Sequence, residues 1–265
     1  MANAEVFHVQ SWAELQEVLF HDTWDEGLQR YRSSYVYRGL NCAAYPLQTS
    51  LMRLRGDYAK LERHLLRNFR KYAHRNAAPG NSMWNWLAVA QHHGLPTRLL
   101  DWTYSPYIAL HFATANLHHY DKDGIIWCVN YVETNQYLPP KFKSVIQEEG
   151  SNAFTAEMLE LVCNSLQEFD SLQEEPFTLF LEPPSLDERI VNQHALFSLM
   201  SGPDYRIDTW LDEHPKHYYK IIIPKSLKWE IRDKLDQANI TERLLFPGLY
   251  GLSVWLKRHY SPIHG

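Results

Sequence analysis

Residues 91–106 read Gln91-His92-His93-Gly94-Leu95-Pro96-Thr97-Arg98-Leu99-Leu100-Asp101-Trp102-Thr103-Tyr104-Ser105-Pro106. This segment brings together an amide, two imidazoles, a guanidinium, a carboxylate, two threonine hydroxyls and a tyrosine. Ordering and burying so many polar groups is costly, and such residues commonly lie on loops that recognise a ligand. We therefore expect a ligand site here. The alternative is a buried polar network that holds two helices together.

The composition is that of a globular chain rich in aromatic residues. Hydrophobic residues make up 45% and charged residues 22% of the 265 residues, which suffices for a packed core. The 9 Trp, 16 Tyr and 11 Phe can build rigid pockets for planar ligands, although most of these rings must lie in the core. A formal net charge of -5 disfavours binding of nucleic acid by the surface as a whole.

Cysteine spacing and hydropathy indicate the compartment. Cys42, Cys128 and Cys163 form no Cys-x-x-Cys pair, which favours a reducing compartment over a zinc site or a disulfide framework. The first residues lack the basic and apolar regions of a signal peptide, and no apolar run approaches the length that spans a membrane. The sequence therefore predicts a cytoplasmic protein with no membrane partner.

The order of expected elements predicts an α+β fold, with a mixed β-sheet core and helices inserted between its strands. No glycine-rich phosphate loop follows a strand, which disfavours a Rossmann or P-loop architecture. No repeat or flexible linker interrupts the chain, so we expect a single domain over residues 1–265. Helices are expected at 11–20, 57–75, 83–92, 105–115, 155–169, after 223 as far as 238, and from 241, with one further turn of helix opened by Ser185, Asp187 and Glu188. Strands are expected at 34–39, 124–129, 177–181, 195–199 and 218–223.

The helix expected at 57–75 combines an apolar stripe with a basic face. The stripe, spaced three and four residues apart, consists of Tyr58, Leu61, Leu65, Phe69 and Tyr72. The basic residues of the opposite face are Lys60, Arg63, Arg67, Arg70, Lys71 and Arg75. Such a face is usually solvated, but it could bind a polyanion, which makes nucleic acid an alternative partner.

Arg38 and Asp101 are the first candidates for a site. Arg38 ends a strand just before Gly39, so the backbone can approach a ligand while the guanidinium offers bidentate donors to a phosphate. A surface salt bridge is the alternative for Arg38. Asp101 lies between two large apolar residues, where we expect burial, with Arg98 or a helix N-terminus as its partner. A structural contact within the loop is the alternative for Asp101.

The histidines and hydroxyls of the dense segment are weaker candidates. His92 and His93 are adjacent, so they point in different directions on a helix, and no third ligand stands at helical spacing. We therefore expect no metal site. Thr103 and Ser105 can each donate to a ligand, although Ser105 has the position of a helix N-cap. The chain has no Gly-x-Ser-x-Gly elbow, His-Glu-x-x-His motif or kinase pattern.

Several blocks of the sequence resemble the FRG domain family. They include Tyr37-Arg38-Gly39, Trp86-Leu87-Ala88, the segment from Gln91 to Thr103, and Ala109-Leu110-His111-Phe112-Ala113. Arg189, Gln193, Phe197 and the block Leu245-Phe246-Pro247-Gly248-Leu249 resemble the family's later blocks, so the similarity covers roughly residues 30–255. This resemblance is specific for the family and far less specific for function. It implies a setting in toxins or in conflict between bacteria and phages.

A second resemblance, to ADP-ribosyltransferases, implies a chemistry and an ADP-ribosyltransferase-like version of the fold. A strand that ends Tyr-Arg-Gly is similar to their first catalytic strand, and residues 101–113 resemble their hydroxyl-bearing strand and following helix. The resemblance implies that Arg38 binds NAD and that Thr103 or Ser105 contacts the nicotinamide ribose. Gln193 would stand at the catalytic glutamate position. The remaining residues expected to bind the nucleotide are Gly39, His92, His93, Thr97 and Arg98.

The sequence also departs from that second family. Gln193 cannot act as an anion, yet an oxocarbenium-like transition state needs negative charge nearby. Asp101 is our preferred source of this charge, before Glu188 and Glu242. Glu242 can instead complement a helix dipole in the first turn after Thr241. We expect an NAD-dependent ADP-ribosyltransferase or NAD glycohydrolase with an unidentified macromolecular acceptor. A non-catalytic module that binds a nucleotide or nucleic acid in the same pocket is the alternative.

Overall fold

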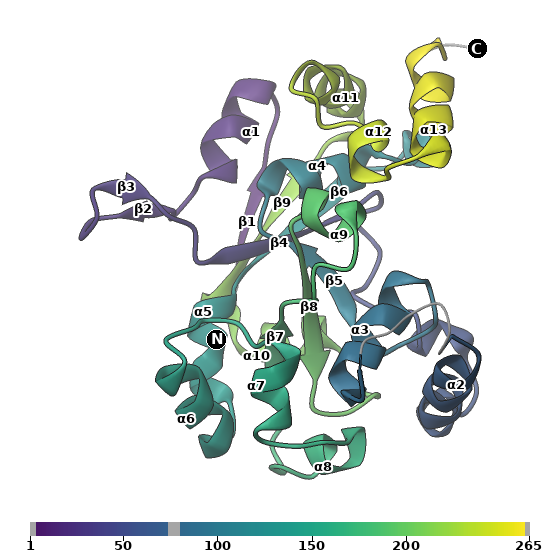
Figure 1. The fold of residues 1–265 in the computed structure, drawn as a ribbon. Coiled ribbons are helices and arrows are strands. Elements are labelled where there is room, and N and C mark those ends of the chain that lie inside the picture. Colours follow the sequence, from purple (N-terminus) through teal and green to yellow (C-terminus); the bar gives the residue numbers. More distant parts are fainter. Residues whose placement is uncertain (1–3, 74–79, 263–265) are drawn as a thin grey trace.

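The structure is a computed structural model that describes residues 4–73 and 80–262. At its centre lies a seven-stranded mixed sheet, which confirms the predicted α+β class (Figure 1). β1 pairs with β9 in parallel, and the other neighbouring strands are antiparallel. The strand order is β1 (Glu5–His8), β9 (Tyr218–Ile223), β6 (Gly124–Asn130), β4 (Tyr35–Leu40), β5 (Leu100–Thr103), β8 (Ala195–Met200) and β7 (Thr178–Leu181).

Helices surround the sheet, and a short hairpin of β2 (Trp24–Asp25) and β3 (Arg30–Tyr31) projects from one side in Figure 1. The helices are α1 (Trp12–Leu19), α2 (Tyr58–Ala73), α3 (Met83–His92), α4 (Pro106–Thr114), α5 (Tyr131–Thr134), α6 (Pro140–Glu148), α7 (Ala156–Glu160), α8 (Leu166–Asp170), α9 (Glu188–Asn192), α10 (Ile207–Glu213), α11 (Lys228–Gln237), α12 (Glu242–Leu245) and α13 (Leu249–His259). Within residues 4–73 and 80–262, none of them is long and apolar enough to cross a membrane.

Side chains of the central strands alternate between two cores, as the period of two in a strand requires. In β6, Ile126 and Cys128 join a cluster that includes apolar residues of α1, α4 and α11. Ile125 and Trp127 join the cluster on the opposite face, which includes residues of α10. Both faces of the central sheet are therefore covered, which explains why β6 is a continuous apolar run in the sequence.

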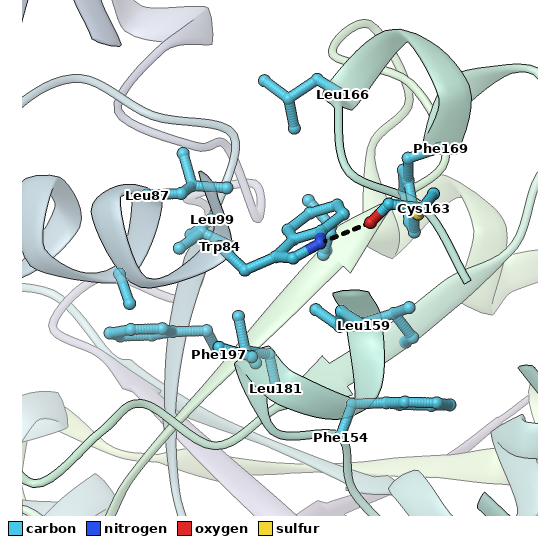
Figure 2. Close-up of a cluster of buried hydrophobic side chains, with 14 of the residues drawn as sticks. Trp84, Leu87, Leu99, Phe154, Leu159, Cys163, Leu166, Phe169, Leu181 and Phe197 are labelled. Carbon is cyan, nitrogen blue, oxygen red and sulfur yellow. Dashed lines mark hydrogen bonds between the residues drawn. The ribbon is translucent and has the colours of Figure 1, made fainter. Parts of the chain in front are cut away.

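A third core fixes α3 against the β7–β8 end of the sheet. Trp84 of α3 is fully buried, and its Nε1 donates a hydrogen bond of 2.9 Å to the carbonyl of Cys163 (Figure 2). Phe197 of β8 packs in the same cluster. Because α3 ends at His92, this packing determines where the dense polar segment begins.

Two predicted helices differ from the observed ones. The helix expected at 155–169 is divided into α7 and α8 because Ser165 caps the second one, accepting a hydrogen bond from the Glu168 amide at 3.1 Å. In α2 the buried positions are Glu62 and Leu66, whereas Leu61 is 45% exposed. The predicted apolar stripe was therefore wrong at Leu61 and at Tyr72, which is 74% exposed, while Tyr58, Leu65 and Phe69 are half-buried. Arg75 lies outside the described residues.

Candidate functional site

The sheet opens between β4 and β5, and this opening forms the base of the candidate site. The two strands share a single pair in the ladder, Tyr37 with Thr103. Beyond that pair they separate, and the Arg38 guanidinium spans the gap and donates from Nη1 to the carbonyl oxygen of Asp101. The segment expected to be a loop is therefore partly strand, with Leu100 and Trp102 buried and Asp101 exposed between them.

A cavity of about 860 Å³ lies over this opening. One wall comes from the end of α3 and from β5, including Gln91 and His92. The opposite wall comes from the segment that starts α9, residues 187–190, and from the turn between α12 and α13 with the start of α13, where Phe246, Pro247 and Tyr250 line the cavity. These segments are far apart in the sequence, so the cavity exists only in the folded chain.

Asp101 is accessible, contrary to the expected burial, because alternation along β5 turns it away from the core. Its side chain is 59% exposed, and both carboxylate oxygens accept hydrogen bonds of 3.1 Å from Nε2 of Gln91. The Thr97 hydroxyl accepts from the Leu99 amide at 3.1 Å and donates to Oε1 of Gln91. Thr97 therefore orients the Gln91 amide that holds Asp101, although Thr97 itself does not line the cavity.

Arg98 pairs with other residues than Asp101. It is 4% exposed and donates to Glu62 at 2.6 and 2.9 Å, and also to Asp170. The residues that line the cavity do not include Arg98. Because two carboxylates occupy its guanidinium, Arg98 links α2 and α8 to β5. Arg98 therefore supports the site and does not line it.

Gly39 has a different role from the expected approach to a ligand. A Cβ at this position would lie 1.8 Å from the carbonyl oxygen of Ala109 and 2.8 Å from the amide nitrogen of Ala113. The space beside Gly39 is therefore filled by the backbone of α4. Glycine is required here so that α4 can pack closely on β4, although the Gly39 backbone also borders the cavity.

His92 and His93 both line the cavity, but their surroundings differ. His92 Nε2 lies 2.7 Å from Oδ2 of Asp187, and the histidine side chain is only 8% exposed. His93 is exposed and packs edge-on against His92, with the ring centroids 5.1 Å apart. Across residues 4–73 and 80–262, no three His, Cys, Asp or Glu side chains form a group that could hold a metal ion.

Thr103, Ser105 and Gln193 fix the base of the cavity. The Thr103 hydroxyl donates to the carbonyl of Gln193 at 2.7 Å, which ties β5 to the end of α9. The Gln193 side chain lines the cavity, but its Nε2 donates to the carbonyl of Leu245 at 2.8 Å. Ser105 is the N-cap of α4 and accepts from the Ile108 amide, the structural role weighed for it above.

Glu242 lies away from the cavity, in a buried cluster of charges. It is 4% exposed, accepts from Arg258 at 2.7 and 2.8 Å, and lies 3.4 Å from Arg232. Burial would raise its pKa, but the two arginines outweigh burial and lower the pKa of Glu242 to about 2. It is also in the first turn of α12, directly after the N-cap Thr241. These contacts make Glu242 a structural carboxylate of the α11–α13 corner.

Several residues that sequence reasoning did not single out for the site also line it, among them Phe112, Asp187, Phe246 and Tyr250. Phe246 lies between the other two rings, with centroids 6.3 Å from Phe112 and 6.5 Å from Tyr250. The guanidinium of Arg189 lies 5.2 Å from the Phe246 ring centre. Helix capping signalled Asp187, but the sequence contains no sign that it reaches His92.

The basic face of α2 is separate from the cavity, whose lining contains none of its residues. Part of that face is occupied within the chain. Arg63 donates to Gln167 at 3.2 Å, Lys60 pairs with Asp57 at 2.6 Å, and the Arg70 guanidinium lies 5.7 Å from the Trp86 ring.

Comparison with known proteins gives one match. Residues 33–122 match the family model described as the FRG domain. This range includes β4, α3, β5 and α4. It therefore contains the wall of the cavity that carries Arg38 and Asp101. The opposite wall, from Asp187 to Tyr250, follows after it. No curated protein and no solved structure matches the chain.

Proposed function

We propose that this chain, which carries an FRG domain, cleaves the bond between nicotinamide and ribose in NAD and transfers ADP-ribose to water or to an acceptor. The observation that carries the proposal is the pairing of Arg38 and Asp101, whose Nη1 and Oδ2 lie 4.0 Å apart at the opening between β4 and β5. NAD requires both charges, because its diphosphate is anionic and its ribose becomes positive at the anomeric carbon during cleavage.

Arg38 suits the diphosphate because its own contacts leave it incompletely satisfied. Its Nε is buried and has no hydrogen-bond partner among the described residues. Burial lowers the pKa of the guanidinium, and Asp101 opposes that shift only in part. A phosphate at the exposed part of the guanidinium would add a second negative charge beside this cation, so binding of an anion here offsets the cost of its burial.

Asp101 suits the ribose because it is accessible and held in place. The Gln91 amide fixes the carboxylate through both oxygens. A carboxylate fixed beforehand stabilises the positive charge that develops as the glycosidic bond breaks, without the reorganisation that water would need. Gln193 would then orient a ribose hydroxyl through its free carbonyl oxygen, since its amide nitrogen is engaged with Leu245.

The remaining wall suits a planar ring. Phe112, Phe246 and Tyr250 form an aromatic row, and the Tyr250 side chain is 74% exposed at its end. The cavity of about 860 Å³ falls within the range of roughly 300–1,000 Å³ that ligand pockets occupy. We place one of the two ring systems of NAD against this row.

Nicotinamide release by the purified protein tests the proposal. The wild-type protein would be incubated with NAD, alone and with a cell lysate that supplies acceptors, beside Arg38→Ala and Asp101→Asn. Asn at position 101 can still accept from Gln91, so the fold should persist. We expect Asp101→Asn to lower kcat by roughly 10²–10³-fold while ADP-ribose affinity changes little. Arg38→Ala should weaken ADP-ribose binding. Asp57→Asn, an exposed carboxylate outside the cavity, is the matched control.

Turnover that survives both substitutions would refute the assigned site. Absence of turnover in either setting, together with absence of NAD binding by calorimetry, would refute the proposed function itself. We place the activity in the cytoplasm because Cys42, Cys128 and Cys163 are buried and free. A toxin or phage-defence setting belongs to the same proposal, and the lysate arm of the assay searches for its acceptor.

A second candidate is a module that binds a nucleotide without turnover. The Gln91 amide and the nearby Arg38 both offset the charge of Asp101, an arrangement that also suits a residue that only orients a ligand. NAD binding without nicotinamide release, unchanged in Asp101→Asn, would favour this candidate. Binding of nucleic acid by α2 predicts instead a steep salt dependence that charge reversal at Arg63 and Arg67 flattens.

A further inference from the structure

The cavity contains a second pair of polar groups besides Arg38 and Asp101. His92, the last residue of α3, meets Asp187, which precedes α9. Nε2 of the histidine lies 2.7 Å from Oδ2 of the aspartate, and both residues line the cavity.

Asp187 is held in position independently of His92. Its Oδ1 caps α9 by accepting from the Ile190 amide at 3.1 Å. Burial would raise the pKa of Asp187, but the Ile190 amide and His92 outweigh burial and lower the pKa. The carboxylate is therefore ionised at neutral pH and accepts a hydrogen bond from Nε2 of His92. With Nε2 as the donor, the lone pair of the imidazole is on Nδ1.

The Nδ1 atom has no hydrogen-bond partner among residues 4–73 and 80–262, although the side chain is only 8% exposed. An imidazole held by a carboxylate on one nitrogen and free on the other is the arrangement of a general base. Other charged or titratable groups that line the same cavity are Arg38, Asp101, His93, Glu188, Arg189, Tyr37 and Tyr250. Nη1 of Arg189 donates a hydrogen bond of 3.5 Å to the carbonyl oxygen of His92.

We propose that His92 is the general base of this cavity and that Asp187 is its positioning residue. The inference rests on the proposed NAD chemistry and assigns the step that chemistry leaves open. Nδ1 of His92 removes a proton from water, or from an acceptor hydroxyl, as that oxygen bonds to the anomeric carbon of the ribose. The bond from that carbon to the nicotinamide nitrogen breaks, and its electron pair neutralises the pyridinium. The histidine later releases its proton to solvent, so charge and atoms balance.

This assignment gives each charged pair one half of the reaction. Arg38 and Asp101 act on the departing side, through the diphosphate and the developing positive charge. His92 and Asp187 act on the entering side, through the nucleophile. Because Gln91 holds Asp101 and is the residue before His92, both halves are oriented by the end of a single helix.

The test compares nicotinamide release by wild-type protein, His92→Gln, His92→Ala and Asp187→Asn over a range of pH. Asn at position 187 keeps the helix cap, so that variant removes the charge alone. We expect His92→Gln to lower kcat by roughly 10²–10⁴-fold with little change in ADP-ribose affinity, and to lose the acid limb of the pH profile. We expect a smaller loss of kcat for Asp187→Asn. Imidazole added to His92→Ala should restore turnover in proportion to its free base, which a structural role would not allow.

His64→Gln, an exposed histidine of α2, is the control for a general effect of removing an imidazole. A wild-type protein that turns over NAD and is unaffected by His92→Gln would overturn this inference and leave the proposed function standing. A wild-type protein without turnover would overturn the proposed function, and the assignment of His92 with it.

Discussion

The buried ion pair between Arg98 and Glu62 allows a quantitative prediction. Glu62→Gln keeps the shape of the side chain and removes its charge. Both partners are almost fully buried, and Glu62 accepts three hydrogen bonds at 2.6–2.9 Å. Removing one member of such a pair costs about 3–5 kcal/mol. Asp170 remains on Arg98 and is 32% exposed, so we expect the lower end of this range.

A loss of about 3 kcal/mol is a large part of the roughly 5–15 kcal/mol that stabilises a typical domain. It corresponds to a decrease in Tm of roughly 6–12 °C. Urea denaturation followed by tryptophan fluorescence would measure the free energy of unfolding. Glu230→Gln removes an exposed partner of Lys234 and should cost less than about 0.5 kcal/mol. A cost below about 1 kcal/mol for Glu62→Gln would refute the reasoning, because the pair would then not be desolvated.

Two further predictions concern stability. The pKa of Glu242 is lowered to about 2 in the folded protein, so its ionised form contributes roughly 3 kcal/mol to the free energy of unfolding above about pH 5, and this contribution is lost as the pH falls toward 2. Glu242→Gln should therefore reduce the fall in stability between pH 5 and pH 2, which denaturation at several pH values would measure. Gly39→Ala should cost about 3 kcal/mol, because the new Cβ would meet the Ala109 carbonyl at 1.8 Å and α4 must move; thermal unfolding beside Gly27→Ala, whose Cβ would meet only the Asp25 side chain at 3.3 Å, would show it, and equal losses in both variants would contradict it.

Much of the fold followed from local patterns. Helix α3 has the predicted bounds, and the apolar run of β6 and the N-cap Ser105 of α4 were also predicted. These features depend on neighbouring residues, which the sequence displays. The break between α7 and α8 was not predicted, although Ser165 and Glu168 have the spacing of a capping box.

The incorrect predictions concern side chains whose burial or hydrogen bonding depends on a residue far away in the sequence. No periodicity could place Glu62 in the core, because its burial depends on Arg98 from another element. Asp101 was expected to be buried because its neighbours are apolar, whereas a strand turns alternate residues outward. Arg98 or a helix N-terminus was expected as the partner of Asp101, whereas Arg38 from β4 lies beside it. The contact of His92 with Asp187 could not be predicted, since it joins positions brought together only by the sheet.

The division of the cavity between distant segments also has a consequence for how the protein is made. A chain emerging from the ribosome presents β4, α3 and β5 early, and so exposes one wall of the cavity while the other is still unmade. The nascent chain would therefore hold Arg38 and Asp101 at an open surface until residues 246–250 had left the exit tunnel. Ligand binding should thus appear last in synthesis, as an all-or-none property of the completed protein.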